Sequence, residues 1–481
     1  MAKCSFGKVV LNGVFAPLYP FGTDLEGRFF YVEEGARRWL LATFDFSGTF
    51  RSTALAFRQA VSQATGIPVS HIWYHELQIH AAPISHELAG APCQRLIALC
   101  LPEIQAMVAR AQPAHIDYVL ADFTGQFNLN REQYIPELGA VTAWAGLEID
   151  SQGRPWTQNP AILNLDGYRP ALPAFDTPIY FDRPADGQGL LAVLRAADGT
   201  VLGSLARFAA HPDVAVLFES HGIADQYRYH FDWTGYLRQA IDRQLGGIGL
   251  YLNGPCADLA VRKGYGGMTT YEACDREALR IGGLIAGALL RAWQARPPRW
   301  QALRLAGIAA ATLPLPLRDT LPHSLQAAQH TGEGLQQAQR NLDAALAQSA
   351  SPARIKRLID EKLHQRTLRT MVQEWVGFTD AELSSRQAAV EAGAVCLNGL
   401  VFAGLPGECL AQTTTLLRAA ALGQRLITLD QVNGYLGYVT TAQAYDQGGY
   451  SYWGGWVRRD AEALLRQQAL GVIRSVSPDE G

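Results

Sequence analysis

Strand-like and helix-like segments alternate over the first third of the chain, and this alternation constrains the fold more than any other feature. The segment 37–48 is an apolar run typical of a buried strand, and 71–80 is a second strand-like run. Between them, 52–66 carries apolar residues near the helical period and ends on Gly66, a common residue at helix C-termini. A further helical pattern covers 93–112. Strand, helix, strand, helix predicts a layered α/β architecture.

The rest of the chain extends the same architecture. The segment 190–212 is typical of a hairpin that turns at Asp198 and Gly199, and 322–392 is rich in Gln, Ala, Arg and Leu at helical spacing. Strand-like patterns return near the C-terminus. We therefore expect one α/β domain over 1–481, with central β-sheets flanked by helices and a helical insertion near 322–392.

Composition and charge argue against several functional classes. The chain is 48% hydrophobic and 18% charged, which is ordinary for a globular protein, and its net charge of -3 offers no basic surplus for nucleic acid. The seven cysteines include no CxxC pair, which favours reduced thiols. The N-terminus shows no signal-peptide pattern, and the most apolar helical run, 280–293, is too short to cross a membrane. We expect a cytoplasmic protein without stable membrane association.

The strand-like segment 71–80 carries an unusual number of polar side chains. Successive side chains of a strand alternate between its faces, so Glu76, Gln78 and His80 should share one face while His75 points away. Such a face is costly to bury without partners. It therefore either faces water at a sheet edge or lines a polar pocket, and these residues alone slightly favour the edge.

Three more stretches could contribute to a site. His211 ends an apolar strand and precedes a proline, a place where metal ligands and general bases often lie. Glu408 follows a strand in the turn GLPGE. Asp258, a candidate catalytic residue, ends the loop NGPCAD beside Cys256, whose thiol has no evident base. The glycine-rich stretch 433–450 carries several tyrosines, which could also be packed surface.

Taken in order, these segments resemble the neutral/alkaline (non-lysosomal) ceramidase family of zinc-dependent amide hydrolases. That family carries a strand ending THTHSGP, then AAHP, a D-x-x-G helix start, a QGxxGD loop, LPGE, and NDYxGYVTT with a further tyrosine. The counterparts here agree in order and spacing over nearly the whole chain: LQIHAAP (77–83), AAHP (209–212), DWTG (232–235), NGPCAD (253–258), LPGE (405–408) and NGYLGYVTT (433–441). The resemblance implies a ceramidase-like α/β catalytic domain. We expect no counterpart here of the family's C-terminal immunoglobulin-like domain or of its secretion signal.

The resemblance also assigns roles to individual residues. It implies that His211, Glu408 and Tyr438 are metal ligands, and that His80 and Tyr450 are catalytic residues. It further implies one divalent metal ion, which the family pattern makes zinc.

The informative departure is Gln78, which stands where the family has its first zinc-binding histidine. A glutamine oxygen is a weak ligand for zinc, so an oxygen-rich ligand set could suit iron or manganese instead. Glu76, on the same predicted face, is an alternative ligand.

We therefore expect a metal-dependent hydrolase that cleaves an amide bond of a small soluble metabolite through a metal-activated water. The change at Gln78 keeps two alternatives open: a metal-dependent lyase, hydratase or iron-dependent oxygenase on the same scaffold, or a non-catalytic relative that binds a ligand. Ceramide itself is a poor candidate because the chain shows no obvious interfacial helix. The helical region 322–392 could pack on the core or form a subunit contact, so a homo-oligomer stays open.

Overall fold

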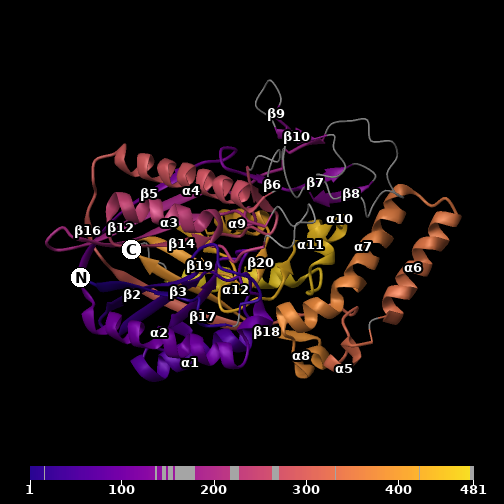
Figure 1. Cartoon of the computed structure of the whole chain (residues 1–481), viewed down its shortest axis with the longest axis horizontal. Coiled ribbons are helices and arrows are strands. Elements are labelled where there is room, and N and C mark those ends of the chain that lie inside the picture. Colours follow the sequence, from indigo (N-terminus) through magenta and orange to yellow (C-terminus); the bar gives the residue numbers. More distant parts are fainter. Residues whose placement is uncertain are drawn as a thin grey trace.

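Two β-sheets stacked face to face form the centre of the molecule, with helices on both outer sides (Figure 1). The computed structural model describes residues 1–15, 17–135, 138–142, 148–149, 155–157, 179–181, 183–216, 227–262, 270–330, 332–421 and 423–476.

The larger sheet has nine strands in the order β14-β13-β12-β5-β1-β2-β3-β4, with β16 also pairing with β5. Neighbours are antiparallel except β3 with β4 and β13 with β14. The strands are β1 (Lys3–Val10), β2 (Glu26–Glu34), β3 (Arg37–Phe44), β4 (Ile72–Glu76), β5 (Gln112–Asp122), β12 (Gln188–Ala196), β13 (Val201–Phe208), β14 (Ile248–Asn253) and β16 (Gln301–Ala302).

The smaller sheet has four strands in the order β17-β18-β19-β21, namely β17 (Leu305–Pro316), β18 (Gln387–Leu397), β19 (Leu400–Gly404) and β21 (Arg425–Leu429). Short strands pair outside both sheets: β6 (Asn128–Asn130) with β15 (Leu259–Val261), β7 (Glu132–Ile135) with β8 (Gly139–Thr142), β10 (Pro155–Thr157) with β9 (Glu148–Ile149) and β11 (Ile179–Tyr180), and β20 (Glu408–Cys409) with β22 (Tyr438–Val439).

Helices cover the outer face of each sheet. On the larger sheet lie α1 (Arg51–Thr65), α2 (Ala91–Arg110), α3 (Asp232–Leu245) and α4 (Tyr271–Gln294). On the smaller sheet lie α9 (Ala411–Ala420) and α12 (Ala461–Val476). To one side of both sheets stand α5 (Leu325–Ala328), α6 (Gly332–Ala347), α7 (Pro352–Thr370) and α8 (Asp380–Ser385), next to α10 (Ala442–Gln447) and α11 (Tyr450–Trp453) (Figure 1).

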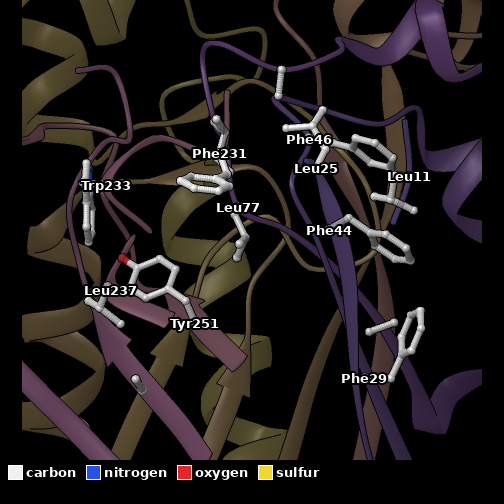
Figure 2. Close-up of a cluster of buried hydrophobic side chains, with 14 of the residues drawn as sticks. Leu11, Leu25, Phe29, Phe44, Phe46, Leu77, Phe231, Trp233, Leu237 and Tyr251 are labelled. Carbon is white, nitrogen blue, oxygen red and sulfur yellow. The ribbon is translucent and has the colours of Figure 1, made fainter. Parts of the chain in front are cut away.

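Apolar side chains fill the space between the two sheets. Trp39 and Trp73 of the larger sheet meet edge to face, with ring centroids 5.2 Å apart, and Phe402 of the smaller sheet packs on Trp39. Burying large rings is strongly favourable, so this layer fixes the stacking of the sheets. A second core lies between the larger sheet and its helices. Figure 2 shows part of it, including Leu77 and Trp233.

Several expectations from the sequence are confirmed. The architecture is mixed α/β, with central sheets flanked by helices. Helix α1 ends on Gly66 in the left-handed conformation, with φ of 72°. The hairpin β12–β13 turns at Asp198 and Gly199, where the Thr200 amide donates to the Asp198 carboxylate at 2.9 Å. The helical insertion is shorter than expected, because helix α8 ends at Ser385 and a strand follows.

The expectation of a strand over 71–80 needs correction. Strand β4 covers only Ile72–Glu76, and all five of its residues are buried, so the interpretation as a water-facing edge is wrong. Beyond it, Gln78 has a φ of 58°, which breaks the alternation of faces. The two-residue period therefore does not set the directions of Gln78 and His80.

Among the described helices, none is long and apolar enough to cross a membrane.

Candidate active site

Loops from both sheets meet just beyond the ends of the parallel strands β4, β13 and β14. The backbone amide of His80 donates to the Pro212 carbonyl at 3.0 Å, which ties the loop after β4 to the loop after β13. His211 lies next to strand β15, where its amide donates to Leu259 at 3.0 Å. The His80 and His211 rings come within 5.4 Å, centroid to centroid. Strand ends of this kind are a usual place for ligand sites in α/β proteins.

The C-terminal part of the chain contributes two facing residues. Glu408 and Tyr438 are in-register partners in the short parallel pair β20–β22. Each follows a glycine with positive φ, Gly407 at 65° and Gly437 at 80°. A Cβ at Gly407 would lie 2.7 Å from the Gly437 carbonyl oxygen, so glycine permits the close approach of the two loops.

The Glu408 carboxylate lies at the buried floor of the site. Its Oε1 accepts a hydrogen bond from the Tyr435 hydroxyl at 2.6 Å, and its Oε2 lies 3.4 Å from Nε2 of His211. Burial raises the pKa of Glu408, but its interactions with His211, Gln78 and Tyr435 outweigh burial and hold the pKa at about 2. Glu408 is therefore an anion at neutral pH. Its Oε2 has no hydrogen-bond donor among the described residues.

Two tyrosines, Tyr438 and Tyr450, pack together beside this floor. The Tyr438 and Tyr450 rings meet edge to face at 5.2 Å. Burial raises the pKa of both phenols, so both stay protonated and can donate hydrogen bonds. Tyr438 is buried, whereas Tyr450 and His80 are partly exposed and form the rim. Burial also lowers the pKa of His80 to about 4, which keeps its ring neutral and able to accept a proton.

Arg131, which the sequence did not single out, lies among these side chains. One terminal nitrogen of its guanidinium donates to the Ala257 carbonyl at 2.8 Å, to the Tyr438 hydroxyl at 3.0 Å and to Nε2 of His211 at 3.2 Å. The other terminal nitrogen lies 3.9 Å from the Asp213 carboxylate. Arg131 follows strand β6, and no local pattern around it signals a site. Only the pairing of β6 with β15 brings it beside His211.

These contacts fix the tautomer of His211. Its Nδ1 lies 2.7 Å from the Cys256 carbonyl, which can only accept, so Nδ1 carries the proton. Arg131 can only donate, so Nε2 of His211 accepts through its single lone pair. His211 thus lies between a backbone carbonyl and a guanidinium.

The Gln78 amide is engaged by protein groups on both sides. The Cys256 thiol donates to Oε1 of Gln78 at 3.4 Å. On its other side, Gln78 interacts with Glu408 and lowers the pKa of that carboxyl. Burial raises the pKa of Cys256 well above its ordinary value, so the thiol stays protonated and is a poor nucleophile. Its role here is to orient Gln78.

Two other expected residues lie behind this floor. The Asp258 carboxylate accepts from the Asn130 amide at 2.7 Å and from the Ala411 backbone amide at the start of α9 at 2.8 Å. It supports the loop on which Arg131 lies, since the Asp258 carbonyl accepts from the Arg131 amide at 2.7 Å. Glu76 is buried at the end of β4, and burial raises its pKa well above the ordinary value.

The donor set does not fit the divalent ion that the resemblance implies. A metal bound at His211 needs the Nε2 lone pair, which accepts from Arg131 instead. The Gln78 oxygen accepts from a thiol. Within the described part of the chain, no group of three or more His, Cys, Asp or Glu side chains is arranged to hold a metal ion.

Comparison with solved structures places this chain in a known architecture, a mixed α/β fold. The whole chain aligns with 75% of neutral ceramidase from Pseudomonas aeruginosa, at a TM-score of 0.63 and 13% identity. It aligns with 76% of a ceramidase complexed with C2, at a TM-score of 0.63 and 14% identity. The chain therefore has a neutral ceramidase-like fold, as its motifs predicted. No model of a protein family matches the sequence, and no curated protein does.

Proposed function

We propose that this protein is a hydrolase that cleaves an amide bond in a small molecule. The observation that carries the proposal is the meeting of His80, His211, Glu408, Tyr438 and Tyr450 at one set of strand ends on a ceramidase-like fold. These residues come from segments far apart in the sequence. A neutral histidine, a cation and protonated phenols around one point are the groups that acyl transfer requires.

In the proposed reaction a water attacks the amide carbon while His80 accepts its proton. The oxyanion that forms is stabilised by the Arg131 guanidinium and by the Tyr450 hydroxyl. The C–N bond then breaks, and His80 returns the proton to the leaving nitrogen. Burial, His211 and Arg131 oppose the protonated form of His80, whereas Asp213 and Glu408 favour it.

The access to the site suits a small substrate. Only His80 and Tyr450 of the five residues are partly exposed, so a substrate would reach the site between these two side chains. A long partner would have to displace the buried floor. Non-peptide amides such as short N-acyl amino acids are the substrate class that we propose.

Incubation with a panel of short N-acyl amino acids, with release of free amine as the readout, tests this function. His80→Gln should abolish release while the protein stays folded by circular dichroism. His86→Gln is the matched control, because His86 is an exposed histidine nearby, and it should behave as the wild type.

The alternative is a protein that binds a ligand without turnover, and one observation favours it. Arg131 already donates hydrogen bonds to both His211 and Tyr438, so the floor is stable without a substrate. If members of the panel raise the unfolding temperature but none is cleaved, the hydrolase proposal fails and the binding alternative gains.

A further inference from the structure

We propose that the Arg131 guanidinium is the resident cation of this site and occupies the place of a divalent metal ion. The inference concerns which cation the site holds, so it stands or falls independently of the proposed hydrolysis. It rests on the contacts of Arg131 with the same atoms that a metal would bind.

A metal ion would compete with Arg131 for one lone pair of His211. Nε2 of His211 has a single lone pair, since Nδ1 donates to the Cys256 carbonyl at 2.7 Å. Arg131 donates to that lone pair at 3.2 Å and to the Tyr438 hydroxyl at 3.0 Å. A metal ion at this point would need the Nε2 lone pair of His211 and a lone pair of the Tyr438 oxygen. Both atoms now accept from the guanidinium.

The charges around this point also favour the guanidinium over a divalent ion. The site holds the Glu408 carboxylate, 3.4 Å from His211, and the Asp213 carboxylate, 3.9 Å from the guanidinium. Arg131 brings one positive charge that cannot be removed at physiological pH. A divalent ion among the same side chains would lie close to this charge in a buried, weakly screened environment.

The Arg131 side chain is also held in place by its surroundings. Its side chain is 1% exposed, its guanidinium donates to the Ala257 carbonyl at 2.8 Å, and its backbone amide donates to the Asp258 carbonyl at 2.7 Å. Strands β6 and β7 hold the chain directly before and after it. Moving the guanidinium aside would leave a buried cation without its partners, which is strongly unfavourable.

The remaining geometry shows what would follow if Arg131 were removed. Oε2 of Glu408 has no hydrogen-bond donor among the described residues and lies 3.4 Å from Nε2 of His211. Two ligands each about 2 Å from one tetrahedral ion lie about 3.3 Å apart. Glu408, His211 and Tyr438 would then form a three-ligand site. Loss of Arg131 should therefore create zinc affinity that the wild type lacks.

The test measures zinc binding in Arg131→Met, which keeps the length of the side chain but loses its charge and its donors. Wild type, R131M and R131M/H211A are stripped with chelator, reloaded with zinc chloride and passed over a desalting column. Bound zinc is counted by elemental analysis, and thermal unfolding is recorded with and without zinc. We expect well under one zinc per wild-type chain and no shift of its unfolding midpoint.

For R131M we expect one zinc per chain and a higher midpoint with zinc, since a ligand that binds only the folded state stabilises it. R131M/H211A should lose both effects. If R131M does not fold, Arg131→Ala supplies the same comparison. One zinc per wild-type chain that is lost in His211→Ala would overturn the proposal, whatever the variants at position 131 do. An R131M protein that folds but binds no zinc would also overturn it.

Discussion

Glu408 and Tyr438 pair in register in β20–β22, so their side chains leave two adjacent loops from neighbouring positions. The loops approach this closely because the residue before each is a glycine with positive φ. The floor of the site thus depends on two residues that carry no chemistry.

Gly437→Ala should lower both stability and activity. A Cβ at Gly437 would lie 2.4 Å from Cδ1 of Trp456, which is fully buried, and the φ of 80° is unfavourable for alanine. Overpacking and left-handed strain together should cost about 2–5 kcal/mol. Gly399→Ala is the matched control: its φ is 79° but a Cβ there would meet nothing within 4 Å, so it should cost about 1–2 kcal/mol. Urea unfolding measures both, and equal costs would contradict the steric explanation.

Gln78→His restores the histidine of the family pattern, yet it should not by itself give a metal site. Arg131 would still hold the lone pair of His211. The double variant Q78H/R131M should bind zinc more tightly than R131M alone, because it adds an imidazole ligand. Elemental analysis and competition with a chromogenic chelator provide the measurement. Stoichiometric zinc in Q78H alone would show that position 78, and not Arg131, controls the metal.

Asp186 should make the free energy of unfolding decrease in acid. Its carboxylate accepts from Arg207 at 2.6 Å and from Arg418 at 2.7 Å. Burial raises the pKa of Asp186, but the two guanidinium groups outweigh burial and lower the pKa to about 2. The folded-state pKa lies below the unfolded value, so the stabilisation is present above about pH 4 and is lost as the pH falls through about 2.

Asp186→Asn removes this contribution. The difference in unfolding free energy between wild type and D186N should therefore narrow by about 2 kcal/mol between about pH 5 and pH 2. Chemical denaturation at a series of pH values measures it. Asp343→Asn, on the exposed face of α6, is the control and should show no such narrowing. A difference that stays constant with pH would refute the role of Asp186.

Asp258→Asn should act on the fold rather than on a chemical step. Both Asp258 oxygens accept hydrogen bonds, one from the Asn130 amide and one from the Ala411 backbone amide. Asparagine would place an NH₂ group against one of these donors and cost about 1–3 kcal/mol. We expect a lower unfolding temperature and a loss of activity that follows the loss of folded protein. A variant of unchanged stability but no activity would instead support a catalytic role.

Local sequence patterns predict much of the fold. The apolar period of 51–65 and Gly66 set helix α1, and Asp198 with Gly199 set the β12–β13 turn, because these choices depend on neighbours a few residues away. The ordered motifs from LQIHAAP to NGYLGYVTT were sufficient to predict the ceramidase-like fold.

Only the tertiary structure decided which side chains lie together at the centre of the site. Gln78 leaves the strand period because its backbone turns left-handed after Glu76, and no residue type at these positions required that. Arg131 lies beside His211 only because β6 pairs with β15. Which group holds a lone pair depends on distances of about 3 Å between atoms from separate segments. Sequence determined which side chains could meet here, and packing of the whole chain determined that a guanidinium lies among them.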